Sequence, residues 1–450
     1  MRHYGSGGGK AGRPPVKTPI FDFVTQYAKN APARFHMPGH KGVNKLGCED
    51  RDLTEIHGAD DLFHATGIIA ESEQNAGALF GCPTVYSAEG SSLCIRAMLF
   101  LAYTRANSRG RILAGRNAHK SFLNTAILLD FPIRWLWAGE DYLSCPLTPE
   151  QVEAAILQEP EKPFAVYVTS PDYLGNTADI EGIARVCHAN DVPLLVDNAH
   201  GAYLRFLPRS CHPMDQGADL CCDSAHKTLP VLTGGAYLHF RQEEDRQPLK
   251  SAMALFGSTS PSYLILQSLD LCNPYLETLP QRLLALAPRL AALKGTLLAR
   301  GFSLVGDELL KLTVRTSPWG YTGEEVADIL ESRNIFPEFA DESHIVFMFT
   351  PENTPEELAR LEQALLALPK GAPRECVLPR CRPEPVLTPR QAAFSQKETV
   401  PVFQSQGRIL ADASVSCPPA VPLVMCGERI DGELPWLFAH FGYSHVTVVK

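Results

Sequence analysis

The sequence predicts an α/β protein whose larger domain is built on a mostly parallel sheet. From about residue 75 to 245, short apolar runs alternate with segments of helical periodicity, which is the pattern of βαβ units. The run 192–196 is apolar and leads into Asp197, as expected of a buried parallel strand with a carboxylate at its end. A second short strand, 219–222, is followed by Ser224, His226 and Lys227. Because ligands bind outside the carboxyl ends of such strands, Asp197 and Lys227 are predicted to share a site.

The remaining elements follow from the same periodicities. Helices are predicted over 20–29, 91–106, 149–158, 180–190 and 323–333, with a long helix around 270–295. Further strands are predicted over 111–114, 133–137, 165–169, 311–315 and 345–349. A Gly-rich basic tail is expected over 1–18, a Gly/Pro-punctuated loop over 35–42, and a linker rich in Pro and Arg over 368–390.

Composition narrows the class of protein. The 450 residues can form a large and a smaller domain, and 45% hydrophobic with 20% charged residues is ordinary for a globular protein. The net charge of −9 argues against nucleic acid or an anionic membrane as a partner. The 13 cysteines show neither a disulfide framework nor paired Cys-x-x-Cys units, so we expect reduced thiols and no metal site. With no signal peptide and no apolar span, the protein is predicted to be cytoplasmic.

An Asp and a Lys at one strand edge are what pyridoxal 5'-phosphate requires. The lysine forms a Schiff base with the cofactor aldehyde, and the aspartate keeps the pyridine nitrogen protonated so that the ring accepts electrons. Lys227 and Asp197 are the candidates for these two roles. Ser224 and His226, which lie close to Lys227 in the sequence, could bind the phosphate.

Two further segments could complete such a site. Gly90, Ser91 and Ser92 open a helix, where backbone N–H groups, hydroxyls and the helix dipole suit a phosphate, although an ordinary helix cap is the alternative. His119 follows the strand 111–114 and could lie flat on the pyridine ring, with a structural histidine as the alternative. Ala199 would allow close approach to the other face of the ring.

These motifs and several others resemble the Orn/Lys/Arg decarboxylase family of fold-type I pyridoxal phosphate enzymes, in its short form. The segments that carry the resemblance are Phe35–Gly42, Asp60–Leu62, Arg116–Ser121, Asp197–Tyr203, Ser224–Leu229, Ser260–Tyr263, Ser268–Asp270, Thr388–Ala392, Cys417–Pro422 and Gly427–Ile430. The His-Met-Pro-Gly-His-Lys segment at 36–41 and the C-terminal block favour this family over the aminotransferases.

The resemblance implies roles for individual residues. Lys227 would carry the cofactor, Asp197 would pair with the pyridine nitrogen, His119 would stack on the ring, and His200 would lie near the cofactor. The phosphate would be held by Ser91, Ser92, Ser224 and His226, with Ser260 or Ser262 reaching the phosphate of a neighbouring subunit. The family implies a homodimer or higher oligomer with the site at the interface. The implied division is an N-terminal arm at 1–50, a cofactor-binding large domain at 51–270, a small α/β domain at 271–370 and a C-terminal region at 371–450.

The chain departs from the family pattern around the cofactor. Asn198 and Tyr203 stand where the family commonly has Glu and His, and Glu89 replaces the Asn before the phosphate turn. A carboxylate at Glu89 would repel the phosphate if it faced it. Other differences are Cys94 and Ile95, Asp172 and Leu174, Leu271–Asn273, Cys417, Ala420 and Val421.

The leading interpretation is decarboxylation of a basic amino acid, arginine before lysine or ornithine, to the corresponding amine and carbon dioxide. Acidic residues that could bind the distal cation of the substrate are Asp60, Asp61, Asp270 and Glu428, each with a cap or structural pair as its alternative. Another fold-type I activity, an aminotransferase or a Cβ-lyase, is the second interpretation. A catalytically silent cofactor-binding homologue is the third, because the surroundings of the phosphate turn have changed.

Overall fold

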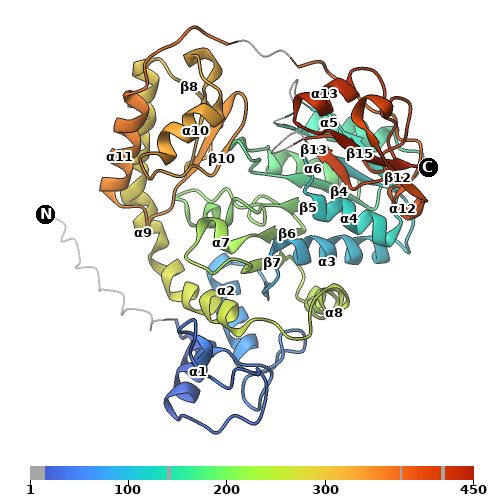
Figure 1. Ribbon diagram of the computed structural model, residues 1–450. Helices are drawn as coiled ribbons and strands as arrows, with labels where there is room; N and C mark the ends of the chain where they lie inside the picture. The colour runs from blue at the N-terminus through green and yellow to red at the C-terminus, as the bar shows by residue number, and fades with distance from the viewer. Residues whose placement is uncertain (1–15, 139–141, 143, 375–377, 417–420) are drawn as a thin grey trace, which may run out of the picture.

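The computed structural model describes residues 16–138, 142, 144–374, 378–416 and 421–450. The large domain contains a seven-stranded sheet in the order β1-β7-β6-β5-β4-β2-β3 (Figure 1). Its strands are β1 (Thr84–Ser87), β2 (Ile112–Gly115), β3 (Ile133–Leu136), β4 (Ala165–Thr169), β5 (Leu194–Asp197), β6 (Leu220–Asp223) and β7 (Ala236–Phe240). Only β7 runs against its neighbours, so the sheet is mostly parallel as predicted.

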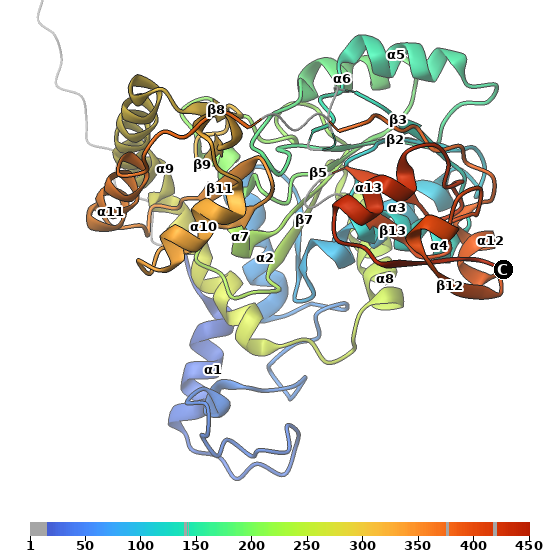
Figure 2. The same cartoon turned by 45° about the horizontal axis from the view of Figure 1, so that its top comes forward.

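Helices cover both faces of this sheet (Figure 2). One face packs against α2 (Ile68–Phe80), α3 (Gly90–Arg105), α4 (Lys120–Leu129) and α8 (Arg246–Phe256), and the other against α5 (Pro149–Gln158) and α6 (Ile180–Ala189). Successive residues of β4 alternate between the two cores, because strand side chains point to opposite faces: Tyr167 lies in the first core and Val166 in the second. This double burial explains why the strands read as continuous apolar runs.

The small domain is attached through α9 (Tyr263–Arg300), the longest helix of the described residues. Its four-stranded antiparallel sheet has the order β10-β11-β9-β8 and is covered by α10 (Gly323–Glu331) and α11 (Pro355–Leu366). The strands are β8 (Ser303–Val305), β9 (Lys311–Arg315), β10 (Phe339–Ala340) and β11 (His344–Met348). The domain boundary predicted between 270 and 271 falls inside α9, so the helix crosses it without a break.

The C-terminal region packs back onto the large domain near α4 (Figure 2). It contains α12 (Pro389–Phe394), β12 (Lys397–Pro401), β13 (Ser414–Ser416), β14 (Pro422–Met425), α13 (Leu434–His440) and β15 (His445–Val449). Strand β12 pairs with β15, and β13 with β14. The changed positions Cys417 and Ala420 lie outside the described residues, as does most of the predicted N-terminal tail.

An N-terminal arm with α1 (Pro19–Lys29) projects from the body of the molecule (Figure 1). The short 3-10 turns are η1 (Glu49–Arg51), η2 (Ala202–Phe206), η3 (Glu243–Asp245), η4 (Ser317–Trp319) and η5 (Val402–Gln404), and α7 (Ala225–Thr228) is a single helical turn. Residues 35–42 form the predicted loop. Within the described parts of the chain, no helix combines the length and apolar character that crossing a bilayer requires.

Candidate functional site

The predicted site residues meet at one cavity of about 480 Å³ at the carboxyl ends of β4, β5 and β6. Nine of them line it: Ser91, Ser92, His119, Asp197, Ala199, His200, Ser224, His226 and Lys227. Ser262 and Ser260 do not line the cavity, so the predicted reach of either to a neighbouring subunit stays a prediction. The C-terminal region supplies part of the wall through Ser414, Pro422 and Met425.

The carboxylate of Asp197 is buried and held in a fixed orientation. Its Oδ2 accepts a hydrogen bond from the hydroxyl of Tyr167 at 3.1 Å, and its Oδ1 accepts one from the backbone N–H of Ala199 at 3.2 Å. Tyr167 lies on β4, next to β5, and is fully buried. Sequence reasoning missed Tyr167, because its position inside an apolar strand gives no sign that its hydroxyl meets a carboxylate.

The amine of Lys227 lies next to the ring of His200, and both residues line the cavity. Lys227 Nζ lies 3.0 Å from His200 Nε2. Burial lowers the pKa of Lys227, against the opposing effect of the Asp197 charge. A lysine with a lowered pKa is a better nucleophile near neutral pH, because more of it is the free amine.

The turn before α3 has the form of an anion site. Gly90 has a positive φ of 70°, and a Cβ added there would meet no atom within 4 Å, so the turn is open above its backbone. The Ser224 hydroxyl donates to Ser91 Oγ at 2.8 Å, and the Ser121 hydroxyl donates to Ser92 Oγ at 2.8 Å. Four hydroxyls at the N-terminus of a 16-residue helix fit a phosphate group.

Glu89 does not direct its carboxylate into this turn. Its Oε1 accepts a hydrogen bond from the backbone N–H of Ser258 at 2.6 Å, and the residue is exposed. Cys94 and Ile95 stand where the family has Gly-Asn. Both lie on α3 and are buried in the core. The turn at 90–92 therefore keeps its hydroxyls and its open backbone despite these changes.

His119 is the N-cap of α4 and caps the helix with its own ring. Its Nδ1 accepts a hydrogen bond from the backbone N–H of Ser121 at 3.2 Å. The side chain is exposed toward the cavity, among the groups that line it. Its predicted stacking on a cofactor ring remains a prediction.

The change at Asn198 is matched by a buried network behind the site. Asn198 Nδ2 donates to Asp223 Oδ1 at 2.7 Å, and Asp223 Oδ2 lies 3.1 Å from Nε2 of both His212 and His239. The two imidazoles keep the pKa of Asp223 below its usual value in spite of burial. These side chains have the ligand types of a metal site, but both Nε2–Oδ2 distances are those of N–H···O hydrogen bonds. A glutamate at position 198 would place a second carboxylate against Asp223.

Tyr203, which departs from the family pattern, lies near an acidic residue of the small domain, Glu308. Tyr203 is fully buried in η2, where burial and the neighbouring charge of Glu308 raise the pKa of the phenol. Glu308 is itself buried and lies 3.2 Å from Lys311 Nζ. Sequence reasoning missed Glu308 and Lys311, since only the docking of the small domain brings them behind His200.

The four acidic residues considered as partners of the substrate's distal cation all form hydrogen bonds or ion pairs outside the cavity. Asp60 and Asp61 accept backbone N–H bonds around the start of α2. Asp270 is buried against Phe21 N and the Ser72 hydroxyl, and Glu428 forms a buried ion pair with Arg116. None of the four lines the cavity.

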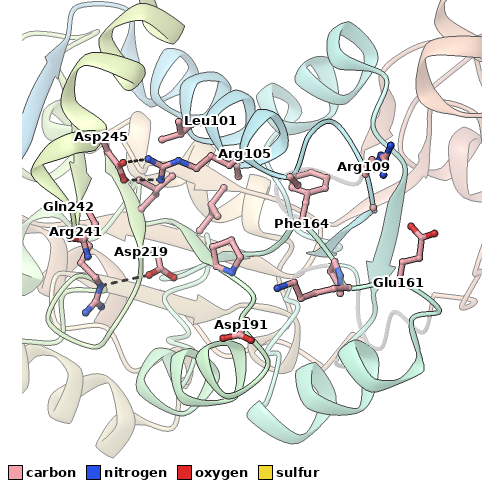
Figure 3. A pocket seen from close by; sticks show the side chains of 18 residues that line it. Leu101, Arg105, Arg109, Glu161, Phe164, Asp191, Asp219, Arg241, Gln242 and Asp245 are labelled. Carbon is pink, nitrogen blue, oxygen red and sulfur yellow. Dashed lines mark hydrogen bonds and ion pairs between the residues drawn. The ribbon is translucent and has the colours of Figure 1, made fainter.

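A second cavity, of about 540 Å³, lies at the amino ends of the strands, on the side of the sheet away from the first cavity (Figure 3). It is lined near the amino ends of β2, β4, β5 and β6, where open α/β sheets do not bind their ligands. Two ion pairs lie within it, Arg105 with Asp245 and Arg241 with Asp219 at 3.7 Å. None of the predicted site residues lines it, so the smaller cavity is the candidate active site.

Comparison with known proteins decides the family. The family model "Orn/Lys/Arg decarboxylase, major domain" matches residues 18–287, and that of the C-terminal domain matches residues 374–443. The chain belongs to the Orn/Lys/Arg decarboxylase family. As a member of this family it is an amino-acid decarboxylase.

Several relatives of this decarboxylase match it along nearly its whole length. It is 30% identical to an arginine decarboxylase of Bacillus subtilis, over 93% of this chain and 92% of that one. A constitutive lysine decarboxylase of Escherichia coli is 24% identical over 57% of this chain and 39% of its own. The solved structure of an E. coli constitutive lysine decarboxylase superposes with a TM-score of 0.77 at 19% identity, covering 97% of this chain and 82% of the other. Lysine decarboxylase A from Pseudomonas aeruginosa gives a TM-score of 0.78 at 19% identity, covering 96% and 80%. The fold predicted from the sequence is thereby confirmed.

Proposed function

We propose that this decarboxylase uses pyridoxal 5'-phosphate to convert arginine into the corresponding amine and carbon dioxide. The observation that carries the proposal is the meeting of Lys227, Asp197 and the serine-rich turn at one cavity. These groups fit the cofactor, because an amine, a buried carboxylate and a phosphate-binding helix start suit its aldehyde, pyridine nitrogen and phosphate. When bound, the cofactor supplies an aldehyde that takes up amino groups and a pyridinium ring that accepts the electrons released with carbon dioxide.

The side chains of this chain would divide the work as follows. Lys227 offers a primary amine of lowered pKa for covalent attachment. Asp197, held by Tyr167, supplies a fixed negative charge that stabilises a protonated ring nitrogen. Ser91, Ser92, Ser224 and His226 would hold the phosphate, and Ala199 leaves room for the ring. The apolar Leu123, Pro422 and Met425 in the wall favour loss of a carboxylate by reducing its contact with water.

The preference for arginine rests on the relatives, while an acid near the cavity supports a distal cation on the substrate. The arginine decarboxylase of Bacillus subtilis aligns over more than nine tenths of both chains, whereas the E. coli lysine decarboxylase aligns over 57% of this chain. Glu338 accepts a hydrogen bond at 2.9 Å from the hydroxyl of Tyr173, a residue of the cavity wall, and its charge acts on Lys227. We assign Glu338 the distal cation of the substrate, in place of the four acids considered from the sequence.

A homodimer with an interfacial site belongs to the same proposal. The arm carries exposed apolar side chains at Phe35, Met37, Val43 and Leu46, which a second copy could cover. Placement in the cytoplasm is supported by the 11 cysteines of the described residues that carry no disulfide.

Product analysis with arginine, lysine and ornithine tests the proposal, with pyridoxal phosphate added or omitted. We expect carbon dioxide and one amine from arginine, a cofactor absorption band, and loss of both in Lys227→Ala. Lys162→Ala, at the second cavity, is the matched control and should behave as the parent. An amino-group acceptor consumed without carbon dioxide would support the aminotransferase interpretation, and a band without any product would support the silent homologue.

A further inference from the structure

A second lysine lies buried directly behind the candidate active site. Lys311, on β9 of the small domain, is 3% exposed. Its Nζ donates to the backbone oxygen of Asp172 at 3.0 Å, pairs with Glu308 Oε2 at 3.2 Å, and lies 3.3 Å from His200 Nδ1. His200 in turn faces Lys227 through its other ring nitrogen, at 3.0 Å. A continuous polar path therefore runs from Glu308 through Lys311 and His200 to Lys227.

Stability alone does not account for this arrangement. A buried ion pair repays the cost of removing two charges from water poorly, and apolar residues of similar volume would serve the core as well. The Lys311–Glu308 pair occurs where the small domain meets the candidate active site, against His200, whose other ring nitrogen faces Lys227. Its position points to a role in the site.

The donor count of Lys311 points to one tautomer of His200. An ammonium group has three donors and no acceptor, so Lys311 must donate to an unprotonated Nδ1. Neutral imidazole then carries its proton on Nε2, and that N–H faces Lys227 Nζ. Because the N–H needs an acceptor, the lone pair of a neutral Lys227 amine completes the path.

We propose that Lys311 is a positioning residue, which holds His200 as the neutral tautomer with its proton on Nε2 and thereby keeps Lys227 as the free amine. The proposal rests on the proposed function only in one respect: that function explains why a free amine is needed at Lys227. In covalent attachment the Nζ lone pair forms the bond to the aldehyde carbon, and the two amine protons leave with the aldehyde oxygen as water. An ammonium form has no lone pair for this step.

The electrostatics around both groups agree with this geometry. Burial lowers the pKa of His200 well below its usual value, and the charges of Lys311 and Lys227 act in the same direction, as do His119 and His226. Burial and Lys311 lower the pKa of Lys227, whereas Asp197, Glu338 and Cys222 raise it.

Competitive acetylation of the full chain prepared without cofactor tests the proposal. Acetic anhydride reacts with free amines, so the extent of labelling at Lys227 over a pH series, read by mass spectrometry, gives its apparent pKa. The double variant Lys311→Met with Glu308→Gln removes both charges together and so avoids leaving one buried charge unpaired. We expect the apparent pKa of Lys227 to rise, with labelling at neutral pH slowed by about tenfold. Thermal unfolding monitored by circular dichroism verifies that the variant is folded.

Two further variants separate the route through His200 from other effects. Lys294→Met is the matched control, because Lys294 is a partly buried lysine that donates to the backbone oxygens of Glu308 and Leu309 rather than to His200. It should label as the parent does. In a His200→Ala background the double change should shift Lys227 little. Unchanged labelling in the folded double variant, or an equal shift without His200, would overturn the proposal. Neither result depends on whether arginine is the substrate or the cofactor binds.

Discussion

Arg116 and Glu428 form a fully buried, bidentate ion pair that joins the large domain to the C-terminal region. The two guanidinium nitrogens lie 2.5 and 2.7 Å from the two carboxylate oxygens. The guanidinium also packs 4.5 Å from the ring centre of Trp137. Arg116 precedes the segment that carries His119, so the pair positions one wall of the candidate active site.

Glu428→Gln should therefore destabilise the protein strongly. The change leaves the Arg116 charge buried without its counter-ion, which typically costs about 3–5 kcal/mol. Urea unfolding at neutral pH measures the loss. The matched control is Glu352→Gln, which breaks the half-exposed pair with Arg282 and should cost at most about 1 kcal/mol. Equal losses in the two variants would mean that burial does not determine the strength of the Arg116 pair.

Asn198→Asp should destabilise the fold although it changes only one atom. The new carboxylate would face Asp223 inside the protein, where Asn198 now donates a hydrogen bond of 2.7 Å. Losing that bond and burying a second anion should cost about 3 kcal/mol at neutral pH. Denaturant unfolding checks this, with the exposed Asn107→Asp as control. A stable Asn198→Asp protein would show that the His212 and His239 network accepts another negative charge.

Asp270 should make stability depend on pH in an unusual direction. Burial raises the pKa of its carboxyl to about 6, from the ordinary value of 3.8 for an aspartate. The folded state therefore favours the protonated acid, so this contribution is complete below about pH 4 and is lost as pH rises through about 6. The loss corresponds to about 3 kcal/mol, at 1.36 kcal/mol for each pKa unit.

Asp270→Asn should remove this pH dependence. Relative to the parent, the variant should gain about 3 kcal/mol in free energy of unfolding between about pH 4 and pH 7. Denaturant unfolding at a series of pH values measures the difference, and Asp328→Asn, an exposed change on α10, should follow the parent throughout. A constant difference between Asp270→Asn and the parent would contradict the raised pKa.

Glu338→Gln should raise KM for arginine more than it lowers kcat. The side chain is exposed, so its attraction for a distant cation is screened and worth about 1 kcal/mol. We expect KM for arginine to rise about fivefold with kcat nearly unchanged. Added salt should raise KM in the parent and less in the variant. Glu331→Gln, at the exposed end of α10, is the control. An unchanged KM would assign the substrate cation to another group.

Much of the site could be predicted because strand ends and helix starts leave a trace in the sequence. Asp197 and Lys227 follow apolar runs, and Ser91 opens a helix, so their meeting follows from the geometry of a parallel sheet. Tyr167 and Lys311 left no such trace. One is an alternate residue of a buried strand, and the other reaches the site only because the small domain docks there.

The changed positions could be recognised from the sequence, but their partners could not. Asn198 and Tyr203 were visible as departures from the family pattern. Their partners, Asp223 and Glu308, are 25 and 105 positions away, and no local periodicity connects them. Polar pairs inside a protein are specified by the assembled fold, so the reason for each change appears only in three dimensions.

The cavity wall formed by the C-terminal region has a consequence for protein engineering. Met425 and Pro422 line the same cavity as Ser91 and Lys227, while Lys311 supports it from the intervening small domain. The candidate active site therefore could not be transferred to another protein as a single segment of this chain. A fragment ending before residue 374, or a chimera that exchanges only the matched major domain, would inherit the lysine and the phosphate turn but lack an enclosing wall, and grafting activity onto a new scaffold would require all three parts of the chain.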